Sequence, residues 1–257
     1  MRKGQRHRGG SILKGLQSRF LPSSIRCLKL LLTFQTRSDR TDNTTFTCIR
    51  KWEMDAEAAK ILFESTILPA FKVHYSAMDD KTQFFVDEEN NEIDGAGSPG
   101  LVQLSRGACD EPDWLVNFAI AHETAHGVVF LECNAQGVSV PQAQDYGRKK
   151  HEAWADLIAT KVLMAQLPDV WALVEAQLHV LANKLGGSAV TASHPTGNKR
   201  VELIREYASA YVQAETPKSK GFLRTIFCCG SAPNNPVLRR EKAFNSCFKK
   251  INNSTNF

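Results

Sequence analysis

Residues 122–126 of this 257-residue chain read HETAH, and the residues on both sides of this stretch are mostly apolar. Apolar flanks of this kind predict a buried helix, in which residues four apart share one face. We therefore expect His122 and His126 to point the same way, with Glu123 beside them. Two imidazoles can converge on one metal ion, and a nearby carboxylate can take a proton from water. The motif predicts a metal site with Glu123 as its general base.

A third ligand is expected further along the chain, because a catalytic zinc ion is held by three protein ligands and keeps one open position. Residues 151–156 read HEAWAD, which places Glu152 and Asp156 on one face of a predicted helix. Glu152 is the expected ligand, and Asp156 is expected to accept a hydrogen bond from a ligand histidine and so orient it. His151 stays open as an alternative ligand, although its position directs it to a different side of the helix from Glu152.

A further candidate for the chemistry is His194, which precedes Pro195 just ahead of another predicted helix. Peptide hydrolysis passes through a tetrahedral oxyanion, and one hydrogen-bond donor aimed at that oxygen contributes about 2.7–4 kcal/mol. We expect His194 to be such a donor if the fold brings it to the metal. Taken alone, a single histidine in a loop carries little information.

The segments before the motif predict a mixture of helix and short strands. The helix is expected over 55–68, ending before Pro69. An acidic, glycine-rich loop is expected over 87–100. The expected strands cover residues 71–76, 82–87 and 101–104.

The segments around and after the motif predict a helical bundle. Asp110 and Asp169 are expected to cap two of its helices. Strands followed by helices favour an α+β fold. The expected helices cover residues 110–132, 148–167, 169–186 and 198–213.

The net charge of +5 conceals an uneven distribution. Residues 1–37 hold nine of the 32 Lys and Arg and no acidic residue, while 217–257 hold eight basic residues and one acidic residue. The middle, 38–216, keeps 15 basic and 26 acidic residues, a net charge of −11. This asymmetry predicts a basic arm or targeting segment over 1–54, a folded acidic domain over 55–216, and a basic, cysteine-containing tail beyond it.

Composition excludes several classes of protein. A hydrophobic content of 42% is too high for a wholly disordered chain, and no run approaches the ~20 apolar residues that span a bilayer. Seven cysteines without a repeated spacing argue against a disulfide framework and favour a reducing intracellular compartment, for a soluble or peripheral protein. The acid-free start also resembles an organelle import sequence, with a plain basic arm as the alternative.

The basic ends raise the question of partners. Cys228 and Cys229 lie among apolar and basic residues, a pattern that permits acylation and peripheral contact with an anionic membrane. The ends lack the interleaved aromatic and basic residues of a nucleic-acid stacking surface, so no nucleic acid is expected as a partner.

Three ordered motifs over about residues 55–210 resemble the gluzincin metallopeptidase family of HtpX and the CaaX prenyl proteases, and in particular its soluble relatives. The family pattern is HExxH, then ExxAD on the next core helix, then His-Pro with an arginine further on. The chain supplies HETAH at 122–126, EAWAD at 152–156, His194 followed by Pro195, and Arg200. HtpX and the prenyl proteases are embedded in membranes, whereas no segment of this chain predicts a spanning helix.

The resemblance implies a zincin-like α+β fold, in which short antiparallel strands precede a helical bundle that carries one zinc ion per chain. It implies an endopeptidase that acts on proteins or peptides, with the two motif histidines and Glu152 as ligands. It further implies that Leu101, Val102 and Gln103 lie on an edge strand that pairs with an extended substrate. Arg200 is implied to contribute to substrate binding.

Two other functions stay open at this point. The first is a non-catalytic module that keeps the same scaffold and holds a peptide in its cleft. The second is a protein that acts at a membrane surface or on nucleic acid through its basic ends. The presence of Glu123 together with all three expected ligands favours the peptidase.

Overall fold

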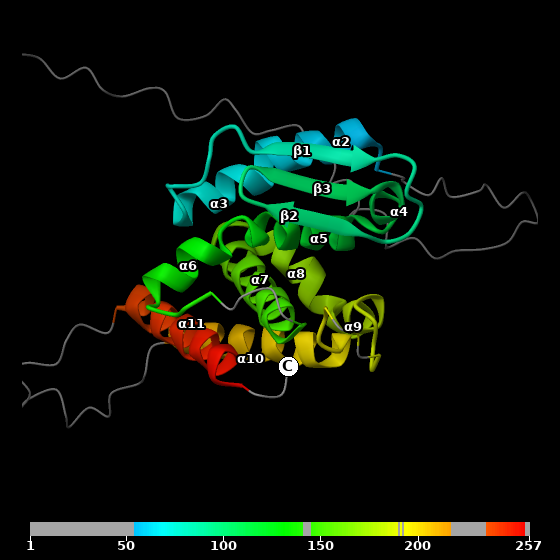
Figure 1. Cartoon of the computed structure of the whole chain (residues 1–257). Helices are drawn as coiled ribbons and strands as arrows, with labels where there is room; N and C mark the ends of the chain where they lie inside the picture. Colours follow the sequence, from blue (N-terminus) through cyan, green and yellow to red (C-terminus); the bar gives the residue numbers. More distant parts are fainter. Residues whose placement is uncertain (1–53, 141–144, 190, 192, 217–234, 255–257) are drawn as a thin grey trace, which may run out of the picture. The chain divides into compact units, whose positions relative to one another are not determined.

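The computed structural model of the chain describes residues 54–140, 145–189, 191, 193–216 and 235–254. Helices make up most of these residues, and the strands among them form one three-stranded sheet (Figure 1). All of the described residues belong to one unit of the fold. The predicted α+β class is therefore confirmed at the level of a small sheet combined with many helices.

The fold begins with three helical segments that follow one another directly: α2 (Ala56–Leu62), the π-helical turn η1 (Phe63–Ile67) and α3 (Leu68–His74). Asp55 caps α2 by accepting a hydrogen bond from a backbone N–H at 2.7 Å. Pro69 has no N–H to donate, and its ring crowds the preceding turn of a regular helix. The wide π turn lies just ahead of Pro69, so the helical path continues past the proline.

The predicted strand over 71–76 is wrong, because most of that segment belongs to α3. Phe63, Ile67 and Phe71 are each four residues apart and completely buried. The apolar period of a helix thus carries through Pro69, which the sequence alone presented as a stop signal.

The sheet has the strand order β1-β3-β2, with β1 at Gln83–Asp87, β2 at Gly95–Ser98 and β3 at Leu101–Ser105. β2 and β3 form an antiparallel hairpin, and Gly100 in its two-residue turn has a φ of 83°, which favours glycine. β1 runs parallel to β3. The expectation of antiparallel strands throughout is therefore wrong for β1.

Strand β2 lies inside the segment that the sequence predicts as a loop over 87–100. Its residues read GAGS and include no β-branched or aromatic side chain, so propensity gives no strand signal. Because β1 and β2 occupy the two edges, β3 is the central strand. The prediction of an edge strand at Leu101, Val102 and Gln103 is therefore wrong.

The helix that carries the motif packs beneath the sheet, against β2 and β3 (Figure 1). The predicted helix over 110–132 is in fact two helices. The first begins at Asp113 and ends at His126, and the second begins at Val129. Asp110 is the C-cap residue of the short helix before the motif helix and does not cap the motif helix, because Pro112 occupies the N-cap position. The elements of this region are α4 (Arg106–Cys109), α5 (Asp113–His126) and α6 (Val129–Ala135).

The longest helix of the bundle, α7 (Asp145–Gln166), contacts α5 and also the helices that follow it. The predictions over 148–167 and 198–213 correspond to α7 and α10, whereas the predicted helix over 169–186 is two helices. Asp169 lies in the first turn of α8 and not at its cap. The later helices are α8 (Pro168–Ala176), α9 (Leu178–Lys184) and α10 (Gly197–Glu215).

A final helix, α11 (Pro236–Asn253), packs against α7 and α10. Its side chains Phe244, Phe248 and Ile251 are completely buried. The Trp154 ring of α7 stacks on Phe248 with 5.0 Å between ring centroids, and the Trp154 indole N–H donates to the Phe248 carbonyl oxygen at 3.3 Å. The predicted domain end at residue 216 is therefore wrong, because the folded body includes α11.

Other predictions about the ends fall partly outside the described residues. Residues 1–53 of the predicted arm lie outside them, as do Cys228 and Cys229. Within the described part of the chain, no helix is long and apolar enough to cross a membrane. The cysteines described there are buried and form no disulfide; they are Cys109, Cys133 and Cys247.

Replacing Phe248 tests whether α11 belongs to the cooperative fold. We expect Phe248→Ala to lower the free energy of unfolding by about 3–5 kcal/mol, because it empties a completely buried site. Val237→Ala on the same helix is the matched control, since Val237 is 50% exposed, and it should cost no more than about 0.5 kcal/mol. Urea unfolding followed by circular dichroism measures both. Equal small losses would show that α11 is not part of the cooperative unit.

Candidate metal centre

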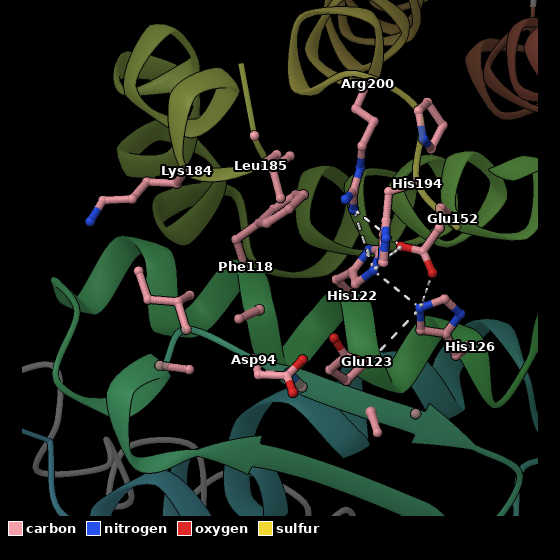
Figure 2. Close-up of a pocket in the computed structure, with 18 of the residues that line it drawn as sticks. Asp94, Phe118, His122, Glu123, His126, Glu152, Lys184, Leu185, His194 and Arg200 are labelled. Atoms are coloured by element: carbon pink, nitrogen blue, oxygen red, sulfur yellow. Dashed lines mark hydrogen bonds and ion pairs between the residues drawn. The ribbon is translucent and has the colours of Figure 1, made fainter. Parts of the chain in front are cut away.

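Helix α5 places the two motif histidines one turn apart on a single face. Their Nε2 atoms are 3.1 Å apart, and His122, Glu123 and His126 each offer a ligand atom within 4.8 Å of the others. His122 and Glu123 are buried, and His126 is largely covered. Figure 2 shows these side chains gathered at one end of a pocket. The local expectation for a helical HExxH motif is therefore met.

Helix α7 brings Glu152 to the same point. Its Oε2 lies 3.3 Å from His122 Nε2, and its Oε1 lies 3.5 Å from His126 Nε2. The two helices pack against each other along this region. Two histidines of α5 and a glutamate at least 26 positions further along the chain thus present two nitrogens and a carboxylate to one small volume.

The spacing of these atoms fits a small divalent ion. Around a tetrahedral zinc ion, ligand atoms lie about 2.0–2.1 Å from the metal, which spaces them about 3.3–3.4 Å from one another. The separations between the His122, His126 and Glu152 atoms are 3.1, 3.3 and 3.5 Å. Two imidazoles and one carboxylate are also a donor set that zinc accepts.

Asp156 lies against the far side of the His122 ring. Its Oδ1 is 2.9 Å from His122 Nδ1, close enough for an ion pair with the protonated ring. Because Asp156 faces Nδ1, it favours the ring form in which Nε2 is free to bind a cation. The position predicted for Asp156 from the sequence is the position it occupies.

Arg200 of α10 is buried, and it is also one of the residues that line the pocket. Its guanidinium donates two hydrogen bonds to Asp156, at 2.7 and 2.8 Å, and its side chain is only 5% exposed. Its Nη2 also lies 3.6 Å from Glu152 Oε2. Arg200 thus supplies the positive partner that the buried Asp156 carboxylate requires, and its contact with a substrate stays a prediction.

His151 does not join the cluster of ligand atoms. Its Nδ1 lies 2.9 Å from Nδ1 of His126, on the opposite side of that ring from the nitrogen that faces Glu152. The alternative in which His151 is the third ligand therefore has less support from the geometry than Glu152 has.

Burial and charge set the proton affinities in this cluster. Burial raises the pKa of Glu123 to about 7, although the positive charge of His122 opposes the rise. Burial also lowers the pKa of His126 to about 3. For His122, burial acts downward, but the Asp156, Glu152 and Glu123 carboxylates outweigh it and raise the pKa to about 10. The carboxylates of this site thus attract positive charge to its centre.

Strand β2 lies directly on α5 beside the cluster. A Cβ atom on Gly97 would lie 1.9 Å from the Glu123 carbonyl oxygen, and one on Gly95 would lie 2.7 Å from Glu123 Oε1. Only glycine permits this approach at position 97, where the helix backbone stands in the way, whereas a side chain at position 95 would displace the Glu123 carboxylate. β2 is not among the site residues expected from the sequence. The signal left unused there is the alternation of Gly95 and Gly97, which allows a strand backbone to lie close to a helix.

The residues predicted to bind substrate lie elsewhere. Val102 is 1% exposed in the central strand, and Leu101 and Gln103 belong to the same strand. The strand whose outer edge is unpaired within the sheet, and whose residues Gly95, Ala96 and Gly97 line the pocket, is β2. If an extended peptide adds to this sheet next to the cluster, the edge it meets is β2.

His194 stands over the cluster from the segment before α10. Its Nε2 lies 3.6 Å from Glu152 Oε2, and its Nδ1 lies 2.7 Å from the hydroxyl of Ser193. The side chain is 47% exposed and lines the pocket. Figure 2 shows it turned toward Glu152 and the motif histidines, as the sequence predicts.

The pocket has a volume of about 540 Å³, and one face of α5 forms much of its wall. His122, Glu123 and His126 occupy the end of that face near residue 126. The wall toward the start of α5 is apolar, and the segment after α9 completes it. The apolar side chains of this wall include Leu115, Phe118, Ala119 and Leu185.

Comparison with known proteins adds no assignment to this geometry. No family model, no curated protein and no solved structure matches the chain. The donor atoms and the pocket described above are therefore the basis for a functional proposal.

The purified chain is expected to bind one divalent metal ion, measured as zinc by elemental analysis. His126→Ala should reduce the bound zinc to a small fraction of one per chain, because it removes one of three protein ligands. His179→Ala is the matched control, since His179 is exposed on α9, and should leave the zinc content unchanged. Wild-type protein without metal, or His126→Ala protein with a full complement, would contradict the site.

Proposed function

We propose that this chain is a zinc-dependent endopeptidase that resembles the gluzincin family of HtpX and the CaaX prenyl proteases. The observation that supports it best is the convergence of His122, His126 and Glu152 beside a second carboxylate, Glu123, at the end of an open pocket. A solely structural metal site is closed by four protein ligands, whereas a three-ligand set leaves a position for water.

The chemistry divides between a bound ion and the residues of the chain. A zinc ion held by these ligands supplies Lewis-acid polarisation and lowers the pKa of water. Glu123 takes the proton from the attacking water and later delivers it to the nitrogen of the leaving amine. Burial raises the pKa of this carboxylate, which favours its holding the proton between the two transfers.

His194 and Asp156 have supporting roles in this mechanism. His194 Nε2 faces the cluster from the side opposite the α5 backbone and can donate a hydrogen bond to the oxygen of the scissile carbonyl as charge develops on it. Asp156 contacts His122 Nδ1 and, with Arg200, keeps that ring turned toward the cluster.

An extended peptide fits along the outer edge of β2. This edge lies beside Glu123, and Gly95 and Gly97 bring the strand backbone into contact with α5. Main-chain hydrogen bonds to a sheet edge hold a peptide independently of its sequence. We therefore place the substrate backbone at β2, in place of the β3 residues expected from the sequence.

The apolar wall of the pocket supports a preference in the substrate. Phe118 and Ala119 precede His122 and Glu123 by four residues each, which is about 6 Å along the helix axis. A substrate side chain close to the scissile bond reaches that distance, since an extended chain advances about 3.3 Å per residue. A large apolar side chain is the group that this wall favours.

Glu123→Gln tests the role of the general base. We expect this variant to keep its zinc and to lose peptidase activity by a factor of about 100 or more, because the amide cannot accept the proton. Glu175→Gln is the matched control, as Glu175 is exposed on α8. Cleavage of a proteome-derived peptide library, read by mass spectrometry, measures activity and specificity together. Full activity in Glu123→Gln would refute this mechanism. Zinc binding without cleavage in wild type would favour a peptide-binding module.

Ala119→Leu tests the apolar wall. Burial of a Leu or Phe side chain is worth about 1.5–3 kcal/mol, so wild type should prefer such residues near the scissile bond by about tenfold or more. The larger side chain at position 119 should move that preference toward Ala and Gly. Ala172→Leu, the same change at an exposed position of α8, should leave the profile unchanged. The kcat/KM values of matched peptides measure the effect, and an unchanged profile in Ala119→Leu would exclude this wall as a specificity determinant.

A further inference from the structure

We propose that His151 is a positioning residue for the metal centre, which accepts a hydrogen bond from Nδ1–H of His126 and thereby turns Nε2 of His126 toward the metal. The proposal rests on the metal site described above and assigns His151 a role other than that of a ligand. It begins from the separation of 2.9 Å between the two Nδ1 atoms.

The two rings lie edge to edge. Their planes differ by only 4°, and their centroids are 5.0 Å apart. Parallel rings stacked face to face keep their atoms about 3.5 Å apart or more, so a contact of 2.9 Å between ring nitrogens requires that the rings meet at their edges. An edge-to-edge contact points the N–H of one ring at the lone pair of the other, which is the geometry of an imidazole hydrogen bond.

The direction of this bond follows from the metal site. His126 Nε2 lies 3.1 Å from His122 Nε2 and 3.5 Å from Glu152 Oε1, so it is the nitrogen that binds a cation and carries no proton. The proton of a neutral His126 therefore sits on Nδ1. Nδ1 of His151 must then be the acceptor, and the proton of His151 sits on its own Nε2.

The charges of the site explain why a neutral acceptor suits this position. Glu123, Glu152 and Asp156 are buried or largely covered carboxylates, and Arg200 is the buried cation among them. Arg200 and a divalent ion together balance the three negative charges. A carboxylate in place of His151 adds a fourth, uncompensated charge, which is costly away from water. An imidazole supplies the acceptor without the charge.

The two ligand histidines therefore have different supports. His122 faces an anionic partner in Asp156, whereas His126 faces an uncharged one in His151. A carboxylate partner makes its imidazole the more basic ligand. Had His151 been a ligand itself, its ring would have to leave His126 and turn toward Glu152.

Two substitutions separate these roles in the full-length chain. His151→Asn keeps an acceptor, because Oδ1 of Asn occupies the place of Nδ1. His151→Leu removes the acceptor and puts an apolar side chain of similar size in its place. The zinc dissociation constant, measured by competition with a chromophoric chelator, is the first readout. The second is the absorption spectrum of the Co²⁺-loaded protein, which reports the number of ligands. His179→Leu, at an exposed position of α9, is the control.

We expect His151→Leu to weaken zinc binding by about 10–100-fold, the usual effect of losing such a partner. His151→Asn should recover most of the affinity, and Co²⁺ spectra of all variants should keep wild-type intensity. Wild-type affinity in His151→Leu would overturn the proposal. A Co²⁺ spectrum of higher coordination in both variants, without recovery in His151→Asn, would assign His151 as a ligand instead. Zinc binding without peptide cleavage in wild type would defeat only the proposed peptidase, whereas wild type without zinc would defeat both proposals.

Discussion

The carboxylate of Asp156 is the group on which the rest of the site depends. It lies on α7 with 1% exposure, contacts the His122 ring of α5, and accepts two hydrogen bonds from Arg200 of α10. A buried charge of this kind is tolerated only where opposite charge and hydrogen bonds surround it. The Asp156 side chain therefore links three helices, of which α7 also packs against both of the others, and it contributes to the orientation of His122.

Helix α5 links this bundle to the sheet. One of its faces carries an apolar wall at Phe118 and Ala119 and then His122, Glu123 and His126, so a single helix lines both the apolar part of the pocket and the candidate metal site. β2 touches the helix through Gly97 without any side chain between them. The sheet thus supplies a backbone edge, and the bundle supplies the ionisable groups. The pocket lies where these two contributions meet.

Local periodicity explains which parts were predictable. Helical spacing of four, which depends on neighbouring residues alone, places His122 and His126 on one face of α5 and Glu152 and Asp156 on one face of α7. The strand at β2 was missed because GAGS has no strand propensity and forms only by pairing with β3. The buried position of Arg200 depends on a residue 44 positions away, which no local pattern reveals. The same holds for α11, whose burial becomes visible only when α7 and α10 are in place.

The docking of α11 also has a consequence for the order in which the molecule assembles. Trp154 and Phe248 are 94 positions apart, and the Lys150 ammonium reaches the backbone of Asn252 in the last turn of α11. These two contacts flank Glu152 on α7 directly. Contacts between distant parts of a chain form late, because a long loop must close first. During synthesis, the segment with Glu152 therefore leaves the ribosome before α11 does, and these contacts on either side of Glu152 form only after α11 has been made.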